Sequence, residues 1–323
     1  MRRYVKILLS LMLLVPIYTQ AQQEVQMSQY MFNGIVLNPS LAGGRETFNA
    51  QLLYRQQWVG IDNAPKTIIG SIDGNITRSG NMGLGLTFYN DNVGIANNTG
   101  GYLSYSFRIK LNDLDDRLSF GVSAGLDIQQ FKGADLFQMA EDGSPIYAPD
   151  DILLTETAYK PDFKVGLFYS RGKSFYAGAS LTKIGTFFTD TINNPHVYLN
   201  VGGNIWLGQA MALKPSLLYG QAFKGNGTLD VSLALSIVDR IWVGASVRLG
   251  TPSISSIPNQ GNIKYVNSIS AMAEIWVTRT IRLGYCFDYG LNRISGIQNG
   301  THEVSLGVTL QRSIKSYRNP RDF

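Results

Sequence analysis

The feature that most constrains this chain is a strict alternation of apolar and polar residues along most of its length. In residues 118–129, Leu, Phe, Val, Ala, Leu and Ile alternate with Ser, Gly, Ser, Gly, Asp and Gln. A period of two is the side-chain period of a β-strand. Similar stretches recur about fourteen times, each roughly ten residues long, with weaker ones at 66–76 and 211–220.

The length of these stretches points to a membrane. A tilted transmembrane strand needs about ten residues, whereas strands of soluble sandwiches usually have about five or six. An open strand edge in hydrocarbon leaves backbone groups without partners, so such strands must close into a ring. We therefore predict an all-β fold, a transmembrane antiparallel β-barrel of about 14 strands with an N-terminal plug or strap segment.

The connections between the predicted strands differ in length in a regular way. The even-numbered connections are tight: Thr77–Gly80, Leu111–Asp116, Gly172–Lys173, Gln209–Ala210, Val238–Asp239 and Thr278–Arg279. The odd-numbered connections are mostly longer: Gln56–Pro65, Asp91–Asn97, Lys132–Tyr159, Gly185–Pro195, Gln221–Asn226, Thr251–Lys264 and Gly290–His302. Short turns at one rim and long loops at the other are typical of bacterial outer-membrane barrels. An even strand count places both ends of the barrel sequence at the short-turn, periplasmic rim.

The first residues resemble a secretory signal peptide. Basic Arg2, Arg3 and Lys6 precede an apolar run from 7 to 18, and Thr19 and Ala21 fit a small-residue cleavage site. We expect cleavage near Ala21 and localisation in the cell outer membrane. The predicted organisation is a signal peptide at 1–21, a plug or strap at 22–45, a barrel at 46–311 and a basic periplasmic tail at 312–323.

Composition excludes several classes of protein. The net charge is +5, but Lys and Arg are scattered and form no stripe, so we predict no nucleic-acid binding. The single cysteine, Cys286, excludes an internal disulfide framework.

Aromatic residues near predicted strand ends suggest interfacial girdles, at Trp206, Trp242, Trp276, Tyr219, Tyr285 and Tyr289.

No catalytic or metal-binding constellation is visible. His302, Ser305 and Asn299 are the three residue types of an outer-membrane phospholipase site. No sequence motif around Ser305, such as G-x-S-x-G, marks it as a nucleophile. Asp113, Asp115 and Asp116 crowd one turn without the glycine and distal Glu of a calcium loop, which favours a solvated turn. We predict that the protein is not an enzyme and has no cofactor.

Residues 22–45 do not alternate and precede the first strand. Met27, Tyr30, Met31, Phe32 and Leu37 require burial, and the barrel lumen is the shelter available at the periplasmic end. This favours a plug, and a strap ordered across the rim remains the alternative.

The same segment carries a family resemblance. Gln29, Tyr30, Met31, Phe32 and Asn33 form one motif, Asn38, Pro39, Ala42 and Gly43 a second, and Arg55, Gln57 and Trp58 a third on the early strand. This combination resembles the PorP/SprF family of outer-membrane proteins from type IX secretion and gliding systems of Bacteroidota. Ser40 and Leu41 stand where the family usually has Ala and Tyr, a mild departure. The specific motifs cover about residues 28–74.

The resemblance implies a barrel that supports export and surface attachment of a secreted partner by binding its C-terminal domain. Some members of the family instead contact periplasmic machinery components, and the sequence leaves both roles open. The outer-membrane lipid is the other expected partner. The alternative function is a transport channel for hydrophobic small molecules with an N-terminal hatch, a class that lacks the motif combination.

The connection at 132–159 is the candidate partner-contact loop. It carries six acidic residues with few balancing bases: Asp135, Glu141, Asp142, Asp150, Asp151 and Glu156. A loop of this length is often functional, and a passive loop is the alternative. The basic tail after the last strand could meet periplasmic machinery or lipid headgroups, or remain solvated.

Overall fold

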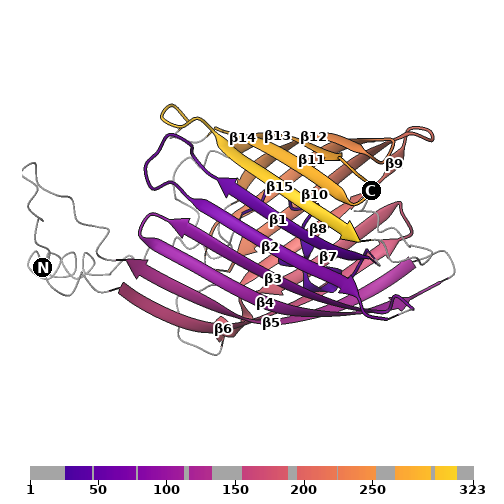
Figure 1. The fold of residues 1–323 in the computed structure, drawn as a ribbon, viewed down its shortest axis with the longest axis horizontal. Helices are drawn as coiled ribbons and strands as arrows, with labels where there is room; N and C mark the ends of the chain where they lie inside the picture. Colours follow the sequence, from indigo (N-terminus) through magenta and orange to yellow (C-terminus); the bar gives the residue numbers. More distant parts are fainter. Residues whose placement is uncertain are drawn as a thin grey trace, which may run out of the picture.

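The computed structural model describes residues 26–45, 47–77, 79–112, 116–132, 155–187, 195–223, 225–251, 266–291 and 295–310. The strands in this part of the chain form one antiparallel sheet, and they run obliquely across the view in Figure 1. Their bounds are β1 Phe48–Gln56, β2 Lys66–Asn75, β3 Met82–Val93, β4 Ala96–Lys110, β5 Asp116–Lys132, β6 Thr155–Arg171, β7 Phe175–Thr182, β8 His196–Gly203, β9 Ile205–Trp206, β10 Met211–Ala222, β11 Gly227–Ile237, β12 Ile241–Thr251, β13 Val266–Trp276, β14 Ile281–Gly290 and β15 Thr301–Leu310.

The sheet closes on itself. With the exception of β8 and β9, each strand pairs with its sequence neighbours, and β1 pairs with β15 to complete the ring. The short β9 continues β8 beyond Asn204, and both pair with β10. The molecule is therefore a closed antiparallel barrel of 14 strands, which confirms the predicted fold class.

Several strand limits differ from the sequence predictions. The predicted loop at 91–97 is a tight hairpin, because β3 runs to Val93 and β4 begins at Ala96. Gly94 adopts a φ of +58°, which suits so short a turn. The predicted connection at 221–226 is also shorter, since β10 ends at Ala222 and β11 begins at Gly227. The sequence predictions ended these strands where the apolar residues stop. A strand that extends past the membrane continues without an apolar face, so its polar end resembles a loop.

The predicted strand at 197–207 is interrupted at Asn204. The Asn204 backbone N–H donates to the Ser174 carbonyl at 2.9 Å, and its Nδ2 donates to the Lys173 carbonyl at 2.6 Å. The turn between β6 and β7 thereby accepts the backbone N–H that the break releases.

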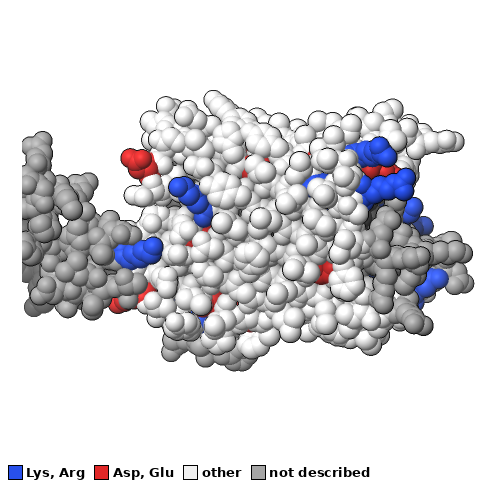
Figure 2. All heavy atoms as spheres, viewed as in Figure 1, with Lys and Arg blue, Asp and Glu red and all other residues white. Residues whose placement is uncertain are grey.

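The two faces of the barrel wall have opposite chemistry. Outward positions carry large apolar side chains, such as Leu52, Leu86 and Leu103, while the polar side chains alternating with them are buried inside. Figure 2 shows the visible face as nearly free of charged atoms between the two ends of the barrel. Within the described residues, no helix has the length and apolar character needed to cross a membrane.

The two ends of the barrel are distinguished by their connections. The rim that holds the tight turns after β2, β4, β6, β9, β11 and β13 is called the short-turn end. The opposite rim is called the long-loop end. β1 begins and β15 ends at the short-turn end, as the even strand count predicted. Exposed basic side chains gather at this end: Lys110, Arg171, Lys173, Arg240 and Arg279.

The girdle prediction was wrong for two tryptophans. Trp242 is 2% exposed and packs inside the barrel, and Trp276 lies on the same inward-facing row as buried Glu274. Trp242 follows outward-facing Ile241, and Trp276 follows outward-facing Ile275. The alternation of the strand therefore turns both tryptophan side chains inward. Trp206, Tyr285 and Tyr289 are exposed outside, as a girdle requires.

Candidate functional site

Residues 26–45 run through the interior of the barrel. Almost all of them are buried, and they hydrogen-bond to inward-facing groups of strands around the whole wall. Two short 3-10 turns, Gly34–Val36 and Pro39–Leu41, allow the segment to bend inside this space. That the segment seals the barrel against passage stays a prediction.

The sequence predicted no direction for the segment inside the lumen. Ser28 contacts Asp288 and Glu303, which lie near the long-loop end of their strands. The Ala42 carbonyl instead accepts from Arg108, two residues before β4 reaches its tight turn. The segment therefore occupies the lumen from the long-loop end to the short-turn end, where β1 begins.

Five buried charged residues lie where the segment starts. Arg55 bridges Asp288 at 2.8 Å and Glu303 at 2.9 Å, and the Arg248 Nε bonds to Asp230 at 2.7 Å. We call Arg55, Asp230, Arg248, Asp288 and Glu303 the mouth cluster. Its members come from β1, β11, β12, β14 and β15, so only closure of the barrel brings them together. Removal of one partner from such a buried pair leaves an uncompensated charge, which is costly.

The mouth cluster grips the backbone of the N-terminal segment. The Glu303 carboxylate accepts the backbone N–H of Ser28 at 2.9 Å and that of Gln29 at 2.7 Å. Arg248 donates to the Met27 carbonyl at 3.1 Å. These charge-assisted bonds hold consecutive peptide groups of the segment, whose backbone bends at Ser28.

Two side chains of the segment are also recognised at this place. The Ser28 hydroxyl donates to Asp288 at 2.7 Å and accepts from Arg55 at 3.0 Å. The Gln29 amide donates to the Glu303 carbonyl at 3.1 Å, and its oxygen accepts from Ser305 at 2.8 Å. Gln29 is fully buried, so each of these bonds replaces water that is no longer accessible.

Sequence reasoning found Arg55 through the family motif but missed its partners. Asp230, Arg248, Asp288 and Glu303 each stand at a polar position of an alternating strand. Ionisable residues at inward positions of a transmembrane strand were the available signal, because the lumen is where such charges are tolerated. Which of them would meet depended on the strand register.

The middle of the segment is held by hydroxyl groups and aromatic contacts. The Tyr30 hydroxyl lies 3.0 Å from the Ser216 Oγ and 3.4 Å from the Ser232 Oγ. Burial raises the pKa of the Tyr30 phenol, so the group stays neutral. Phe32 packs edge-on against Trp242 with ring centroids 5.4 Å apart. The apolar residues of the motif therefore form the core inside the barrel.

The second motif turns the segment at the level of β5 to β7. Asn38 caps the turn by accepting the backbone N–H of Ser40 at 3.0 Å, and its Nδ2 reaches the Leu167 carbonyl at 3.0 Å. The barrel wall is glycine where this turn touches it. A Cβ on Gly121 would lie 2.1 Å from the Ser40 nitrogen, and one on Gly166 would lie 2.0 Å from the Asn38 Oδ1.

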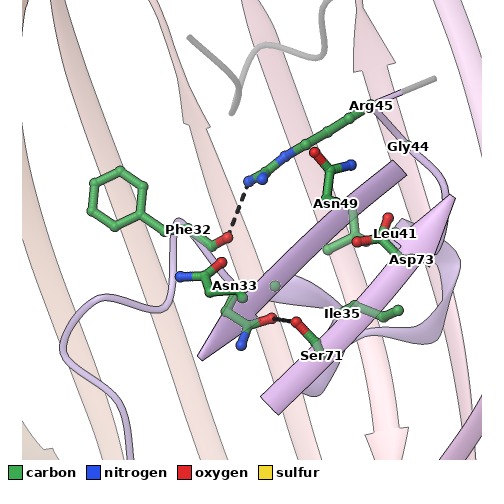
Figure 3. A pocket seen from close by; sticks show the side chains of 11 residues that line it. Phe32, Asn33, Ile35, Leu41, Gly44, Arg45, Asn49, Ser71 and Asp73 are labelled. Carbon is green, nitrogen blue, oxygen red and sulfur yellow. Dashed lines mark hydrogen bonds between the residues drawn. The ribbon is translucent and has the colours of Figure 1, made fainter. Parts of the chain in front are cut away.

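Gly43 ends the second motif where the segment reaches the short-turn end. Its φ of +61° is unfavourable for other residues, and its N–H donates to the Asp73 carboxylate at 2.8 Å. A small cavity of about 30 Å³ lies beside it, between the segment and β1 and β2. Figure 3 shows Arg45 reaching the Phe32 carbonyl across this cavity, and Ser71 donating to Asn33. The space suffices for about one water molecule.

A second polar cluster fixes the connection between β7 and β8. Lys183 pairs with Asp127, and the hydroxyls of Tyr89 and Tyr102 donate to the same carboxylate at 2.9 and 2.7 Å. The Tyr102 hydroxyl also lies 2.9 Å from Asp162, so its single proton is shared between the two carboxylates, and Asp162 accepts the backbone N–H of Gly185 at 3.1 Å. The connection is thereby bonded to inward-facing groups of β3 to β6, and sequence reasoning did not anticipate this cluster.

The remaining residues of the third motif lie apart from the mouth cluster. Gln57 follows β1, and its N–H donates to the Pro65 carbonyl at 2.9 Å. Trp58 adopts a φ of +48°, and its N–H donates to the Thr301 Oγ1 at 3.3 Å. Both residues shape the connection between β1 and β2 at the long-loop end.

Most of the candidate partner-contact loop lies outside the described residues. This applies to Asp135, Glu141, Asp142, Asp150 and Asp151. Glu156 was assigned to the loop but belongs to β6, where it pairs with Phe131 and is exposed. The regions 1–21 and 312–323 and the turn residues Asp113 and Asp115 are also outside this part.

The structure does not assemble the lipase-like residues. Ser305 faces inward and bonds to Gln29, whereas His302 lies on the opposite face of β15 and bonds to the Tyr285 hydroxyl at 2.7 Å. Within the described part of the chain, no group of three or more His, Cys, Asp or Glu residues could hold a metal ion.

Comparison with known proteins adds the family. Residues 19–308 match the family model described as type IX secretion system membrane protein PorP/SprF. A comparison with curated proteins finds no match at the level of sequence.

Solved structures share the fold at low sequence identity. The CymD monoaromatic hydrocarbon channel is 9% identical with a TM-score of 0.52, over 88% of this chain and 94% of the channel. A Pseudomonas aeruginosa FadL homologue is 11% identical with a TM-score of 0.48, over 87% and 93%. The Acinetobacter baumannii outer membrane protein Omp33 is 10% identical with a TM-score of 0.46, over 83% and 100%. These likenesses concern the barrel fold alone.

Proposed function

Since the chain belongs to the PorP/SprF family of type IX secretion system membrane proteins, we propose that it supports export and surface attachment of a secreted partner by binding the partner's C-terminal domain. The family match over residues 19–308 is the observation that carries this proposal. Family and fold together make the chain an outer-membrane β-barrel of that system, a class of protein that is not enzymatic.

Hydrogen bonds between connections at the long-loop end support a role in protein recognition. The Val59 N–H donates to the Gly300 carbonyl at 2.9 Å, and the Asn299 N–H donates to the Val59 carbonyl at 2.7 Å. The Gly94 N–H donates to the Asn63 carbonyl at 3.2 Å. Residues 57–65, 94–95 and 295–300 thus form one connected surface, which we call the loop platform. A preorganised surface of this kind binds a partner with less loss of conformational entropy.

Ile297 is the exposed apolar residue that marks the loop platform. It is 69% exposed at the end of the barrel that would face the outside of the cell. Apolar side chains in such positions commonly mark protein interaction sites. The five acidic residues between β5 and β6, Asp135, Glu141, Asp142, Asp150 and Asp151, would add charge recognition in this proposal.

The interior argues against the alternative of a hydrophobic transport channel. The mouth cluster and the cluster around Asp127 place buried charges along the lumen. An apolar solute would displace residues 26–45 and desolvate these charges without forming bonds to them.

Purification of the tagged protein from native membranes tests the proposal. We expect a large secreted protein with a type IX C-terminal domain to co-purify, and its surface attachment to depend on the barrel. Recovery of bound lipid alone would favour a channel instead.

A matched pair of variants localises the contact. Ile297→Asp should reduce surface retention of the partner, measured by labelling intact cells, about tenfold if Ile297 is a central contact. Val238→Asp is the control, because Val238 is 63% exposed at a tight turn of the short-turn end. Equal retention in both variants would show that the loop platform is not the contact.

A further inference from the structure

The mouth cluster has the features of a peptide-binding site. Three of its bonds to residues 27–29 go to backbone groups, through Glu303 and Arg248, and three go to the side chains of Ser28 and Gln29. The backbone bends at Ser28, which turns two consecutive N–H groups toward the one Glu303 carboxylate, and a peptide from another chain that adopts this bend offers the same groups in the same order. The additional bonds to Ser28 and Gln29 define a preference for a small hydroxyl residue followed by an amide residue.

The site requires an occupant. Arg55 donates to the Ser28 hydroxyl, and Glu303 receives two peptide N–H groups in addition to the guanidinium. Without a peptide, these buried groups would lose partners that nothing else on the described wall supplies in the same positions. A competing peptide is therefore favoured over an empty site.

The position of the cluster determines from which side a competitor arrives. Arg55 lies one residue before the end of β1, and Glu303 lies two residues after the start of β15, both at the long-loop end. The opposite side of the lumen is filled by residues 30–45. A segment from outside the cell thus has the shorter path.

We propose that the mouth cluster is a binding site for a short, bent peptide, occupied in cis by residues 27–29 of this chain and open to exchange with a segment of the secreted partner that adopts the same bend. The identity of the competitor rests on the function proposed above. The structure assigns the site itself independently of that function, from the backbone bonds of Glu303 and Arg248.

Peptide binding to a variant with a weakened cis segment provides the test. Ser28→Pro with Gln29→Ala removes one backbone donor, the hydroxyl and the amide, but leaves the mouth cluster unchanged. We expect a fluorescent peptide of residues 24–33 to bind this purified full-length variant saturably in detergent, and to bind the wild type at least about tenfold more weakly. A scrambled peptide is the control, and a gel shift between unheated and heated samples verifies the folded barrel.

A third change examines the receptor side. Adding Glu303→Gln to the double variant should weaken peptide binding about tenfold, since the charged acceptor of two N–H groups is lost. Binding that is unchanged by Glu303→Gln, or absent from a folded double variant, would overturn the proposal. If the double variant does not fold, Gln29→Ala alone serves, with the same expected order of affinities.

Cysteine labelling of intact cells tests the side of access. Gln26→Cys should react with a membrane-impermeant maleimide from outside, and more rapidly after addition of the peptide. Asn63→Cys is the positive control at the long-loop end, and Lys173→Cys is the negative control at the short-turn end; native Cys286 is fully buried. Labelling of Gln26→Cys only after cell lysis would contradict entry from the outside.

The two proposals can fail separately. Partner retention without peptide exchange would refute only the peptide site. Peptide exchange without any co-purifying partner would refute only the proposed function.

Discussion

At the scale of single residues, the unusual feature of this protein is a set of charges buried beside a peptide backbone. Arg55 is paired with both Asp288 and Glu303, and all three are almost inaccessible to solvent. A buried charge that loses its partner is costly, whereas a complete network is tolerated. Substitution of Glu303 should have the largest effect, because its carboxylate bonds to Arg55, Ser28 and Gln29 at the same time.

Glu303→Gln should therefore destabilise the barrel. We expect a loss of about 2 kcal/mol in the free energy of unfolding, limited by the remaining Arg55–Asp288 pair. Urea titration of the protein in lipid vesicles measures this difference. Glu156→Gln is the matched control, since Glu156 is exposed on β6 and should change the stability by less than about 0.5 kcal/mol. Equal effects of the two substitutions would refute the role of the network.

At the scale of elements, the N-terminal segment and the barrel wall are fitted to each other. The turn at Asn38–Pro39 touches the wall at Gly121 and Gly166, where there is no room for a Cβ atom. The alternation in β5 predicts that Gly121 faces inward, but it does not indicate what approaches it. The contact with the segment explains why this inward position lacks a side chain.

Gly121→Ala should loosen the segment from the wall. Its Cβ would lie 2.1 Å from the backbone nitrogen of Ser40, so the turn must move, at a cost of about 1–3 kcal/mol. We expect faster tryptic cleavage after Arg45 in the folded protein. Gly101→Ala is the control, because Gly101 faces outward and its nearest neighbouring atom would be 4.0 Å away. Identical cleavage rates in both variants would argue against a close fit.

At the scale of the whole molecule, the barrel separates an apolar exterior from a polar inner wall that surrounds residues 26–45. Outward-facing residues such as Leu103 and Leu86 meet lipid, while the charges lie inside or at the two ends (Figure 2). The long-loop end carries the loop platform and the mouth cluster, and the short-turn end carries exposed bases. Partner binding and peptide exchange are thus both proposed for the same end.

Leu103→Arg tests the orientation of the wall. Leu103 is 59% exposed in the middle of β4, where a lipid-facing Arg costs about 2–4 kcal/mol. We expect a smaller folded fraction after refolding into lipid vesicles, measured by the gel shift on heating. Ile297→Arg, outside the membrane in the connection before β15, should fold like the wild type. Normal folding of Leu103→Arg would place this face away from lipid.

The alternating pattern by itself determined the barrel and the direction of most side chains, because strand geometry fixes the face of every second residue. It also contained the correct direction of Trp242, which the expectation of an aromatic girdle overrode. Polar strand ends that extend past the membrane, as in β3 and β4, were taken for loops, since no apolar face marks them.

Only the tertiary structure decided which inward residues meet. Arg55 and Glu303 are 248 positions apart, and pairing of β1 with β15 makes them neighbours. The course of residues 26–45 from the long-loop end was likewise undetermined by sequence, because this segment has no repeating pattern and takes its path from polar groups on distant strands. Local geometry is encoded in neighbouring residues, whereas the lumen and its contents arise when the ring closes.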